Sequence, residues 1–455
     1  MLLGSIGIAV SISARQWLKN RRDRKLLNLD VRQELRKMRK PKVKKPSKSQ
    51  EGTLIGHIGK RPIYIPDWIR HLLLCGTTGS GKTVVLANFI KRALEKGFPL
   101  PIIDGKGDLG KGSILDIVKT LNKEYKRKVY VVNLSDPKSS DKYNPFKNAT
   151  PTMAKDMLIN MTDWSEEHYK SNAERYIQRL LYLLEYSRIP FSFNNIIRHL
   201  PLEKYKELSK ILLENGKISK DEHMENIEIG NTSGKPVQSS LARFSTIAEG
   251  ELGNIFSDDG IDMSEAIKEG AVILFILNPL TYPELSPAFG RLILIDSKKA
   301  IGNLFNSGIE RTFFIMDEIS SYASPVLIDL INKSRSAGVT CILSTQSLSD
   351  LDCAYGEAFK EQIIENCNTF IIMRQNSGVN AEHWANILGT RNTMEITHQL
   401  RQDRQDTLST GYGSAKRVRE YLYHPDDIKT LQTGEGIFLS KDTNADSRVN
   451  IYKPF

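Results

Sequence analysis

Eight consecutive residues have the types and spacing that bind nucleotide phosphates. They read GTTGSGKT, fit the pattern G-x-x-x-x-G-K-[ST], and are Gly76, Thr77, Thr78, Gly79, Ser80, Gly81, Lys82 and Thr83. The glycines of this motif let successive backbone N–H groups face phosphate oxygens at the positive end of a helix. We expect Lys82 to reach the β- and γ-phosphates and the Thr83 hydroxyl to bind Mg²⁺. The pattern therefore predicts a site for ATP and Mg²⁺.

A second motif supplies the acidic residues that such a site needs. FFIMDE (Phe313–Glu318) places two carboxylates directly after four apolar residues, where a buried strand would end. We expect Asp317 to bind Mg²⁺ and Glu318 to polarise the attacking water as a general base. The alternative is two solvated acids at a strand end, but four apolar residues before an Asp-Glu pair are unusual on a surface. The two motifs together predict ATP hydrolysis.

Two further residues are candidates for this chemistry. Gln346 follows the next apolar run and would face the γ-phosphate from the carboxyl edge of the sheet, as a sensor of hydrolysis or as an ordinary loop amide. Arg335, in KSRSAG (Lys333–Gly338), precedes that run and so belongs at the opposite edge from its own P-loop. In a ring it could enter the neighbouring subunit's site as an arginine finger, whereas the alternative is an exposed arginine at a helix end.

The glycine-rich segment DGKGDLGKG (Asp104–Gly112) follows the second apolar run, and its glycines imply tight turns near the nucleotide. It also contains a GxGxxG pattern, but no dinucleotide-binding unit surrounds it. Two interpretations of Asp104 and Lys106 stay open. They contact phosphate or a subunit interface, or they only shape a structural turn.

The elements that must position these residues alternate between strands and helices. Continuously apolar runs suit strands buried on both faces, as in a parallel α/β sheet. Seven such runs occur: His71–Cys75, Leu100–Asp104, Val129–Leu134, Ala271–Leu277, Thr312–Asp317, Val339–Thr345 and Thr369–Arg374. The P-loop lies between the first run and a helix predicted from Lys82 to about Leu94, which is the context that the motif requires.

One block interrupts this alternation. Between about Thr150 and Lys235 no run resembles a strand, and segments such as Ala173–Tyr186 have apolar residues at helical spacing. We therefore predict an all-α domain inserted into the sheet domain. The division is 1–14, a short apolar membrane anchor; 15–51, a basic arm and linker; 52–149 and 236–455, the two parts of the nucleotide-binding domain; and 150–235, the insert.

The net charge of +11 is concentrated near the N-terminus. Residues 15–48 hold 15 Lys and Arg against 3 acids, so the rest of the chain is near neutral. Such a run could bind nucleic acid, lie against an anionic membrane or be a solvated tether. The apolar stretch Met1–Ala14 favours the membrane, although it is shorter than the roughly 20 residues that span a bilayer.

The composition favours magnesium over a transition metal. The four cysteines form no CxxC pair and the eight histidines form no HxxxH or HExxH pattern. The sequence therefore predicts neither a disulfide framework nor a zinc site.

The order of the motifs resembles a known family. The chain is similar to the TraD/TraG-type coupling proteins of conjugative type IV secretion. The similarity rests on the order of these segments: GTTGSGKT, DGKGDLG, YNPF (Tyr143–Phe146), a helical block, FFIMDE, KSRSAG, STQSLSDL (Ser344–Leu351) and Tyr421–Phe438. These coupling proteins are related to the FtsK- and HerA-like DNA-pumping motors. The resemblance covers residues 52–438.

The resemblance implies a RecA-like fold and a homo-hexameric ring that uses ATP to move single-stranded DNA, with its relaxase, toward the type IV secretion channel. The helical insert would face the relaxosome, and the protein would be associated with the cytoplasmic face of the inner membrane. By this match Lys82, Thr83 and Asp317 bind MgATP, and Glu318, Gln346 and Arg335 take the roles given above.

This sequence departs from the family pattern in three places. The family usually has two N-terminal transmembrane helices, has DPKG where this chain has DGKG, and has an acidic C-terminal tail. An alternative function is a secretion-machine assembly ATPase that acts on protein subunits, and it would use the same site. A monomeric nucleotide-dependent switch or kinase is a third possibility, which gives Arg335 no role in trans.

Overall fold

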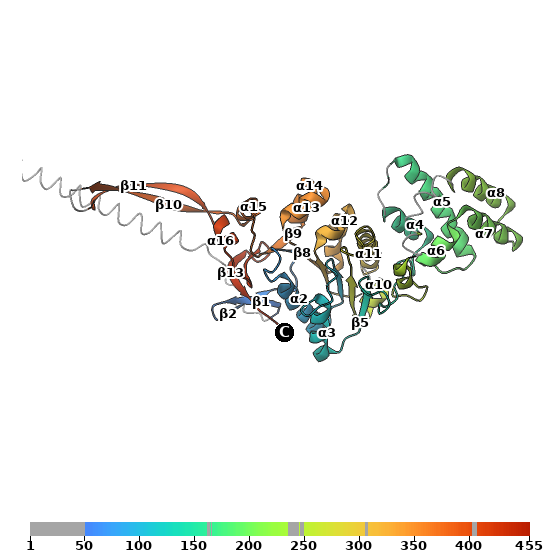
Figure 1. Cartoon of the computed structure of the whole chain (residues 1–455), viewed down its shortest axis with the longest axis horizontal. Helices are drawn as coiled ribbons and strands as arrows, with labels where there is room; N and C mark the ends of the chain where they lie inside the picture. The colour runs from blue at the N-terminus through green and yellow to red at the C-terminus, as the bar shows by residue number, and fades with distance from the viewer. Residues whose placement is uncertain are drawn as a thin grey trace, which may run out of the picture. The chain divides into compact units, whose positions relative to one another are not determined.

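The seven apolar runs form the parallel part of an eleven-stranded sheet in the computed structural model, which describes residues 51–161, 164, 166–234, 245, 250–304, 308–402 and 407–455 (Figure 1). In sheet order the parallel strands are β9 (Cys367–Ile372), β3 (His71–Cys75), β8 (Val339–Thr345), β7 (Thr312–Asp317), β4 (Leu100–Asp104), β6 (Val272–Ile276) and β5 (Val129–Asn133). Most of their residues are fully buried, as strands covered on both faces require. The predicted α/β fold with a mostly parallel sheet is confirmed.

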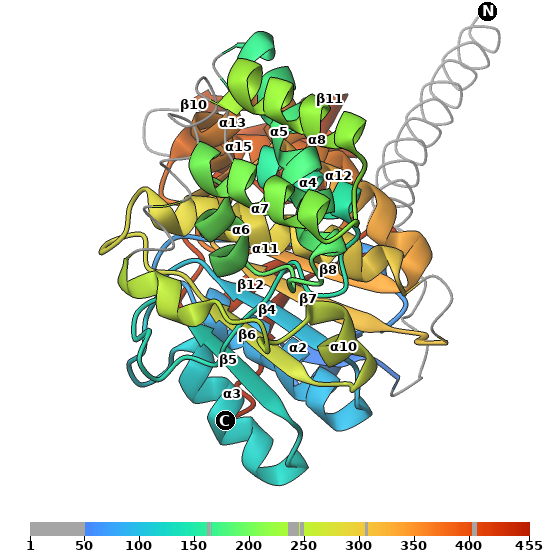
Figure 2. The same ribbon diagram turned by 90° about the vertical axis from the view of Figure 1, so that its right-hand side faces the viewer.

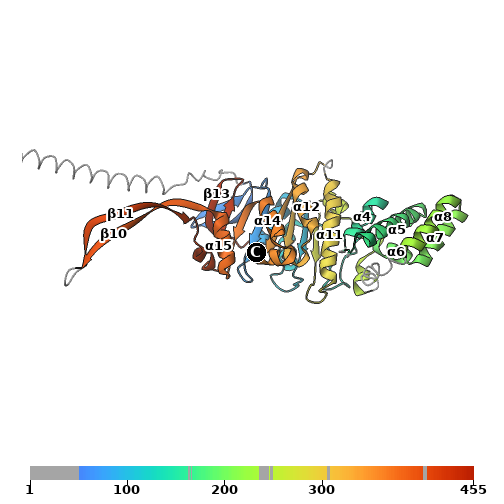
Figure 3. The ribbon, with the colours of Figure 1, turned by 90° about the horizontal axis from the view of Figure 1, so that it is seen from above.

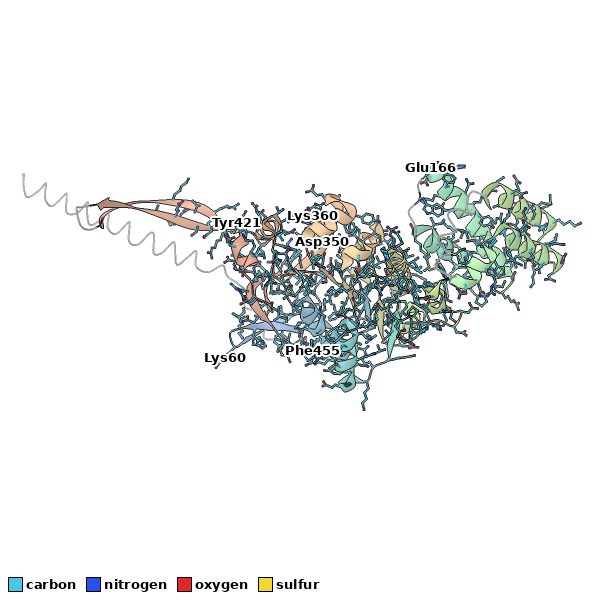
Figure 4. The ribbon with its side chains drawn as sticks, in the orientation of Figure 1. Lys60, Glu166, Asp350, Lys360, Tyr421 and Phe455 are labelled. Carbon is cyan, nitrogen blue, oxygen red and sulfur yellow. The ribbon has the colours of Figure 1, made fainter. Side chains whose placement is uncertain are left out.

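Four strands beyond β9 extend the sheet in the antiparallel sense. They are β12 (Glu435–Ser440), β13 (Ala445–Ile451), β1 (Thr53–Ile58) and β2 (Arg61–Ile65). The edge hairpin of β1 and β2 turns at Gly59 and Lys60, where Gly59 has φ +58° and the Lys60 side chain is labelled in Figure 4. The sequence analysis did not predict these four strands.

The helices cover the two faces of the sheet according to the direction of each connection. A strand–helix–strand crossover between parallel strands is almost always right-handed. Connections that run toward β5 place α2 (Lys82–Lys96) and α3 (Ile114–Tyr125) on one face. Those that run toward β9 place α11 (Leu285–Gly302), α12 (Pro325–Ser334), α13 (Leu348–Tyr355) and α14 (Glu357–Asn366) on the other face, as Figures 1 and 2 show.

A group of helices replaces the strand alternation after β5. They are α4 (Pro151–Asn160), α5 (Glu167–Tyr186), α6 (Phe193–His199), α7 (Leu202–Glu214) and α8 (Lys220–Ile229), which lie together in Figure 2. Side-chain caps start several of them, among them the reciprocal pair of Ser219 and Glu222 at α8. No strand occurs among the described residues of 151–234. The fold thus contains the predicted helical insert, while the five-segment division of the chain stays a prediction.

The described residues divide into two compact units. The smaller consists of Ser377–Thr430 and Thr443–Asp446 and holds α15 (Gly378–Leu388), α16 (Pro425–Lys429) and a two-stranded ribbon of β10 (Thr390–Gln402) and β11 (Thr407–Tyr421). The larger unit holds the rest of the sheet, its helices and the helical insert.

A buried polar network joins the sheet domain to the start of the insert. The Tyr143 hydroxyl donates to Asp296 on α11 at 2.6 Å, and the Lys299 ammonium, also on α11, lies 2.9 Å from Asp296 and 3.1 Å from Asp262. Lys299 also donates to the backbone carbonyl of Pro145 at 2.7 Å. Figure 3 shows α11 between α12 and the helices of the insert. The YNPF motif is therefore held by charges on a sheet-covering helix.

The network predicts which of two adjacent lysines stabilises the fold. Lys299→Met leaves the buried carboxylates of Asp296 and Asp262 without their cation, so we expect a loss of about 3–5 kcal/mol in the free energy of unfolding. Lys298→Met removes only a surface pair with Asp329 and should cost about 0–1 kcal/mol. Urea unfolding of both variants measures the difference, and equal midpoints would contradict the assignment.

Candidate nucleotide-binding site

The phosphate-binding loop takes its shape from glycines at the end of β3. Gly79 and Gly81 have φ of +75° and +112°, which is the left-handed region that favours glycine. A Cβ on Gly76 would lie 2.6 Å from the Cβ of Met373, so this position has no room for a side chain. The backbone N–H groups of Gly79 and Gly81 donate to no residue that the structure describes. They are available to an anion at the start of α2.

Lys82 and Thr83 follow on the first turn of α2. Lys82 is buried, and its ammonium donates to the backbone carbonyl of Gly76 across the loop. Burial lowers the pKa of the Lys82 ammonium, and the nearby charge of Lys106 lowers it further. The predicted phosphate-binding residues thus lie together at the carboxyl end of β3.

The strand register brings two acids from different strands to the same edge. In the pairing of β4 with β7, Asp104 is directly opposite Asp317. Both carboxylates are almost fully buried. Burial raises the pKa of Asp104 to about 7, and the charge of Asp317 contributes. The Lys106 ammonium, from the loop after β4, lies 2.8 Å from Oδ2 of Asp317 and supplies a counter-charge.

Glu318 and Gln346 connect the acidic edge to the P-loop. The Gln346 amide donates to Oε2 of Glu318 at 3.2 Å and accepts from the Thr78 hydroxyl at 3.2 Å. Burial raises the pKa of Glu318, and the charge of Asp317 raises it further. Glu318 has φ +50°, a conformation that non-glycine residues rarely adopt and that often occurs at functional sites.

The helix after Gln346 fixes this amide at a strand–helix junction. α13 begins two residues later, and Ser347 and Asp350 form a reciprocal cap, with Asp350 labelled in Figure 4. Because β3 and β8 pair with Cys75 opposite Thr345, the next residue on each strand, Gly76 and Gln346, lies at the same edge. Gln346 thus lies at the carboxyl edge of the sheet, beside the P-loop.

The residues at this edge fit a magnesium ion bound with a nucleotide. Oδ1 of Asp317 is buried and has no hydrogen-bond partner in the described part of the chain. A hydroxyl such as that of Thr83 and one carboxylate are the oxygen ligands that Mg²⁺ takes when phosphates and water fill its other positions. The described residues contain no group of three or more His, Cys, Asp or Glu side chains that could hold a metal ion.

Arg335 lies away from this site. It is exposed, caps the end of α12 and precedes β8, so it occupies the amino edge of a sheet whose carboxyl edge holds the P-loop. Its charge adds to burial in lowering the pKa of His71, at the start of β3, to about 4. The structure therefore agrees with the predicted placement, and its role in trans stays a proposal.

The sequence analysis did not identify two contributors to the site. Lys106 was left open between a contact and a turn, because only the fold shows that its loop faces Asp317. The loop Gln432–Glu435 covers the P-loop, with Gly434 donating to the Ser80 carbonyl at 2.9 Å and Thr433 donating to the Gly79 carbonyl at 3.3 Å. Its GEG glycines were the available signal for a close approach.

The structure explains why residue 105 is glycine where the family usually has proline. Its backbone N–H, which proline lacks, donates to the Asp317 carbonyl at 3.2 Å. A Cβ at this position would lie 2.5 Å from the Ser321 hydroxyl oxygen. The DGKG departure therefore tightens the contact between this loop and the strand end that holds Asp317.

A family model for the type IV secretion-system coupling protein DNA-binding domain matches residues 56–451. The chain belongs to this family. The coupling-protein DotL of Legionella pneumophila is 25% identical over 191 residues, which cover 37% of this chain and only 24% of DotL. An uncharacterized protein of Mycoplasma pneumoniae is 36% identical over 100 residues, which cover 22% of this chain and 67% of that protein.

Solved structures share the fold of this chain. The bacterial conjugative coupling protein TrwB has a TM-score of 0.60 at 16% identity, with 90% of each chain covered. TrwB has also been solved with ADP and Mg²⁺ and with a non-hydrolysable ATP analogue. VirB4 of Thermoanaerobacter pseudethanolicus has a TM-score of 0.53 at 12% identity, covering 89% of this chain and 97% of VirB4.

Among the residues that the structure describes, no helix is long and apolar enough to cross a membrane. The predicted anchor at 1–14 and most of the basic arm at 15–51 lie outside the described residues.

The geometry of the site predicts that one variant binds MgATP but hydrolyses it very slowly. Glu318→Gln keeps the hydrogen-bonding shape but cannot take a proton from water, so we expect ATP turnover to fall about 10²–10⁴-fold while MgATP still binds. Steady-state ATPase assays and equilibrium binding of a fluorescent ATP analogue measure the two properties. Glu357→Gln, at an exposed acid that begins α14, is the control and should retain both. Normal turnover by Glu318→Gln would show that another group is the base.

Proposed function

We propose that this protein is an ATP-hydrolysing coupling protein that recruits a relaxosome and pumps single-stranded DNA to a type IV secretion channel. The observation that carries the proposal is the hydrogen-bonded link from Thr78 through Gln346 to Glu318, in a chain of the coupling-protein family. That link joins the phosphate-binding loop to the residue that would activate water. Such a link between phosphate binding and water activation suits an ATPase.

The enzyme class is that of a P-loop ATPase whose cofactors are ATP and Mg²⁺. TrwB, which shares the fold, binds ADP with Mg²⁺ and an ATP analogue. In this chain the buried Oδ1 of Asp317 and the Thr83 hydroxyl would hold Mg²⁺, and the N–H groups of Gly79 and Gly81 would face the phosphates at the start of α2.

Each remaining site residue takes a step in ATP hydrolysis. Lys82 would leave the Gly76 carbonyl and neutralise the β- and γ-phosphates. Glu318 would orient and deprotonate the attacking water. Gln346, which contacts both Glu318 and the P-loop, would sense whether the γ-phosphate is present and pass that difference to α13.

Arg335 and the P-loop lie at opposite edges of one sheet, which supports head-to-tail packing of subunits in the proposed ring of six copies. When subunits pack head to tail, the amino edge of the sheet in one copy meets the carboxyl edge of the sheet in the next. Arg335 of one copy would then complete the nucleotide site of the next. In such a ring, a few polar or basic side chains per subunit would grip DNA phosphates without reading bases.

The remaining partners follow from the domain division. The insert within 150–235 would face the relaxosome, and the sheet domain at 52–149 and 236–455 would form the motor. The apolar segment 1–14 and basic arm 15–51 would associate the protein with the inner membrane and leave most of the chain on its cytoplasmic face.

DNA should stimulate the ATPase. We expect single-stranded DNA to raise the ATPase rate of the full-length protein severalfold, with the stimulation decreasing as salt rises because phosphate contacts release counterions. The measurement is steady-state ATP hydrolysis across a salt series with and without DNA. Robust hydrolysis by intact oligomers that ignores DNA would instead support an assembly ATPase acting on protein subunits.

Mixed rings test whether the site is shared. Arg335→Ala subunits lack the finger but keep their own catalytic base, whereas Glu318→Gln subunits lack the base but keep the finger. If Arg335 acts in trans, mixing the two inactive variants should recover a measurable fraction of wild-type ATPase activity. No recovery at any ratio, with subunit exchange verified, would contradict the shared site. Lys333→Ala, two residues away and exposed, is the control and should stay active alone.

A further inference from the structure

Lys106 reaches the buried acid of the nucleotide site from a rigid loop. The Gly105 N–H donates to the Asp317 carbonyl, and the Lys106 N–H donates to Oδ1 of Asp104 at 2.9 Å. Gly107 then turns with φ +73°, where a Cβ would lie 2.2 Å from the Leu277 carbonyl oxygen. These contacts fix the backbone beside β7, so the Lys106 side chain is directed to Asp317 and not to solvent alone.

The pair is asymmetric in exposure. Asp317 is 1% exposed, whereas the Lys106 side chain is 35% exposed. A buried carboxylate needs a nearby cation, because the protein interior solvates charge poorly. Burial alone would lower the pKa of the Lys106 ammonium, but the charge and hydrogen bond of Asp317, together with the charges of Glu318 and Asp104, outweigh burial and raise the pKa. The partly exposed ammonium can move toward solvent, while the carboxylate cannot.

The same carboxylate, at the end of β7, is the ligand that we propose for Mg²⁺. Oδ2 accepts from Lys106 and Oδ1 has no partner among the described residues, so the two oxygens of Asp317 face two different cation positions. A divalent ion on Oδ1 would lie within a few ångströms of the ammonium. Like charges at that distance repel strongly in a water-poor site.

We propose that Lys106 holds the place of the metal: its ammonium neutralises Asp317 between catalytic cycles, and Mg²⁺ arriving with the nucleotide displaces it. This inference rests on the proposed function, since it assumes that Asp317 binds the metal. The exchange keeps the buried acid neutralised throughout the cycle. The return of Lys106 to Asp317 would also favour release of Mg²⁺ with ADP after hydrolysis.

Metal affinity tests this exchange. The probe is Mn²⁺, whose binding to full-length protein with saturating ADP is measured by electron paramagnetic resonance. Lys106→Met removes the competing cation, so we expect Mn²⁺ to bind about tenfold more tightly or better, which corresponds to about 1.4 kcal/mol. Lys106→Arg keeps a cation and should bind Mn²⁺ as the wild type does or more weakly. Lys111→Met, at an exposed lysine of the same loop, is the matched control and should change nothing.

Thermal unfolding supplies a second readout without turnover. In EDTA the Lys106→Met variant should unfold at a lower temperature than the wild type, because Asp317 loses its cation. Saturating Mn²⁺ and ADP should reduce or reverse that difference, since the metal then neutralises the same carboxylate. If Lys106→Met cannot be purified folded, Lys106→Gln takes its place in both measurements.

Three results would overturn the inference. Unchanged Mn²⁺ affinity with an equal loss of stability in EDTA and in Mn²⁺ would make the pair purely structural. Weaker Mn²⁺ binding by Lys106→Met would mean that Lys106 helps to hold the metal nucleotide. Tight Mn²⁺ binding by Lys106→Arg would show that charge is not what competes. If the wild type itself binds no Mn²⁺ with ADP, the proposed nucleotide site fails, which is a distinct outcome.

Discussion

The site depends on one electrostatic constraint, which is that three carboxylates are buried together at the carboxyl edge of a parallel sheet. Asp104, Asp317 and Glu318 are each less than one tenth exposed. Two lysines, Lys82 from the P-loop and Lys106 from the next loop, lie near them. Burial raises the pKa of Glu318, and the positive charges of these lysines act against burial to lower it. Because burial raises the pKa of Asp104 to about 7, this acid is partly protonated at neutral pH, and the cluster approaches charge balance. Divalent metal and nucleotide phosphate can enter such a cluster only by rearranging its cations.

The register of the parallel strands and the backbone conformation at Glu318 bring these carboxylates and the P-loop together. The pairing of β4 with β7 sets Asp104 beside Asp317, and the pairing of β3 with β8 sets the P-loop beside Gln346. The left-handed conformation of Glu318 turns the chain immediately after Asp317. Backbone conformations of this kind cost free energy and persist where the surroundings enforce them. Here the Gln346 amide and the Ser320 hydroxyl bond to the Glu318 carboxylate.

The sequence predicted the centre of the fold better than its periphery. All seven parallel strands were predicted because strands buried on both faces are continuously apolar. The antiparallel strands β1, β2, β12 and β13 were missed, since half-exposed strands carry polar residues that interrupt such runs. The ribbon β10–β11 was missed because its sequence contains no continuously apolar run. The P-loop, Asp317 and Glu318 were located from motifs, and Gln346 from its place after a strand. The pairing of Lys106 with Asp317 could not be predicted, because 211 residues separate them and only the strand order brings them together.

The central claim is that Asp317 exchanges an ammonium for Mg²⁺ when nucleotide binds between subunits. The most direct test is an electron cryo-microscopy structure of the Glu318→Gln variant with MgATP and single-stranded DNA. The account predicts a metal ion on Thr83 and Asp317, the Lys106 ammonium beyond hydrogen-bonding distance of that carboxylate, and Arg335 of the adjacent copy at the γ-phosphate. A nucleotide bound with Lys106 still paired to Asp317 and the metal held elsewhere would contradict it.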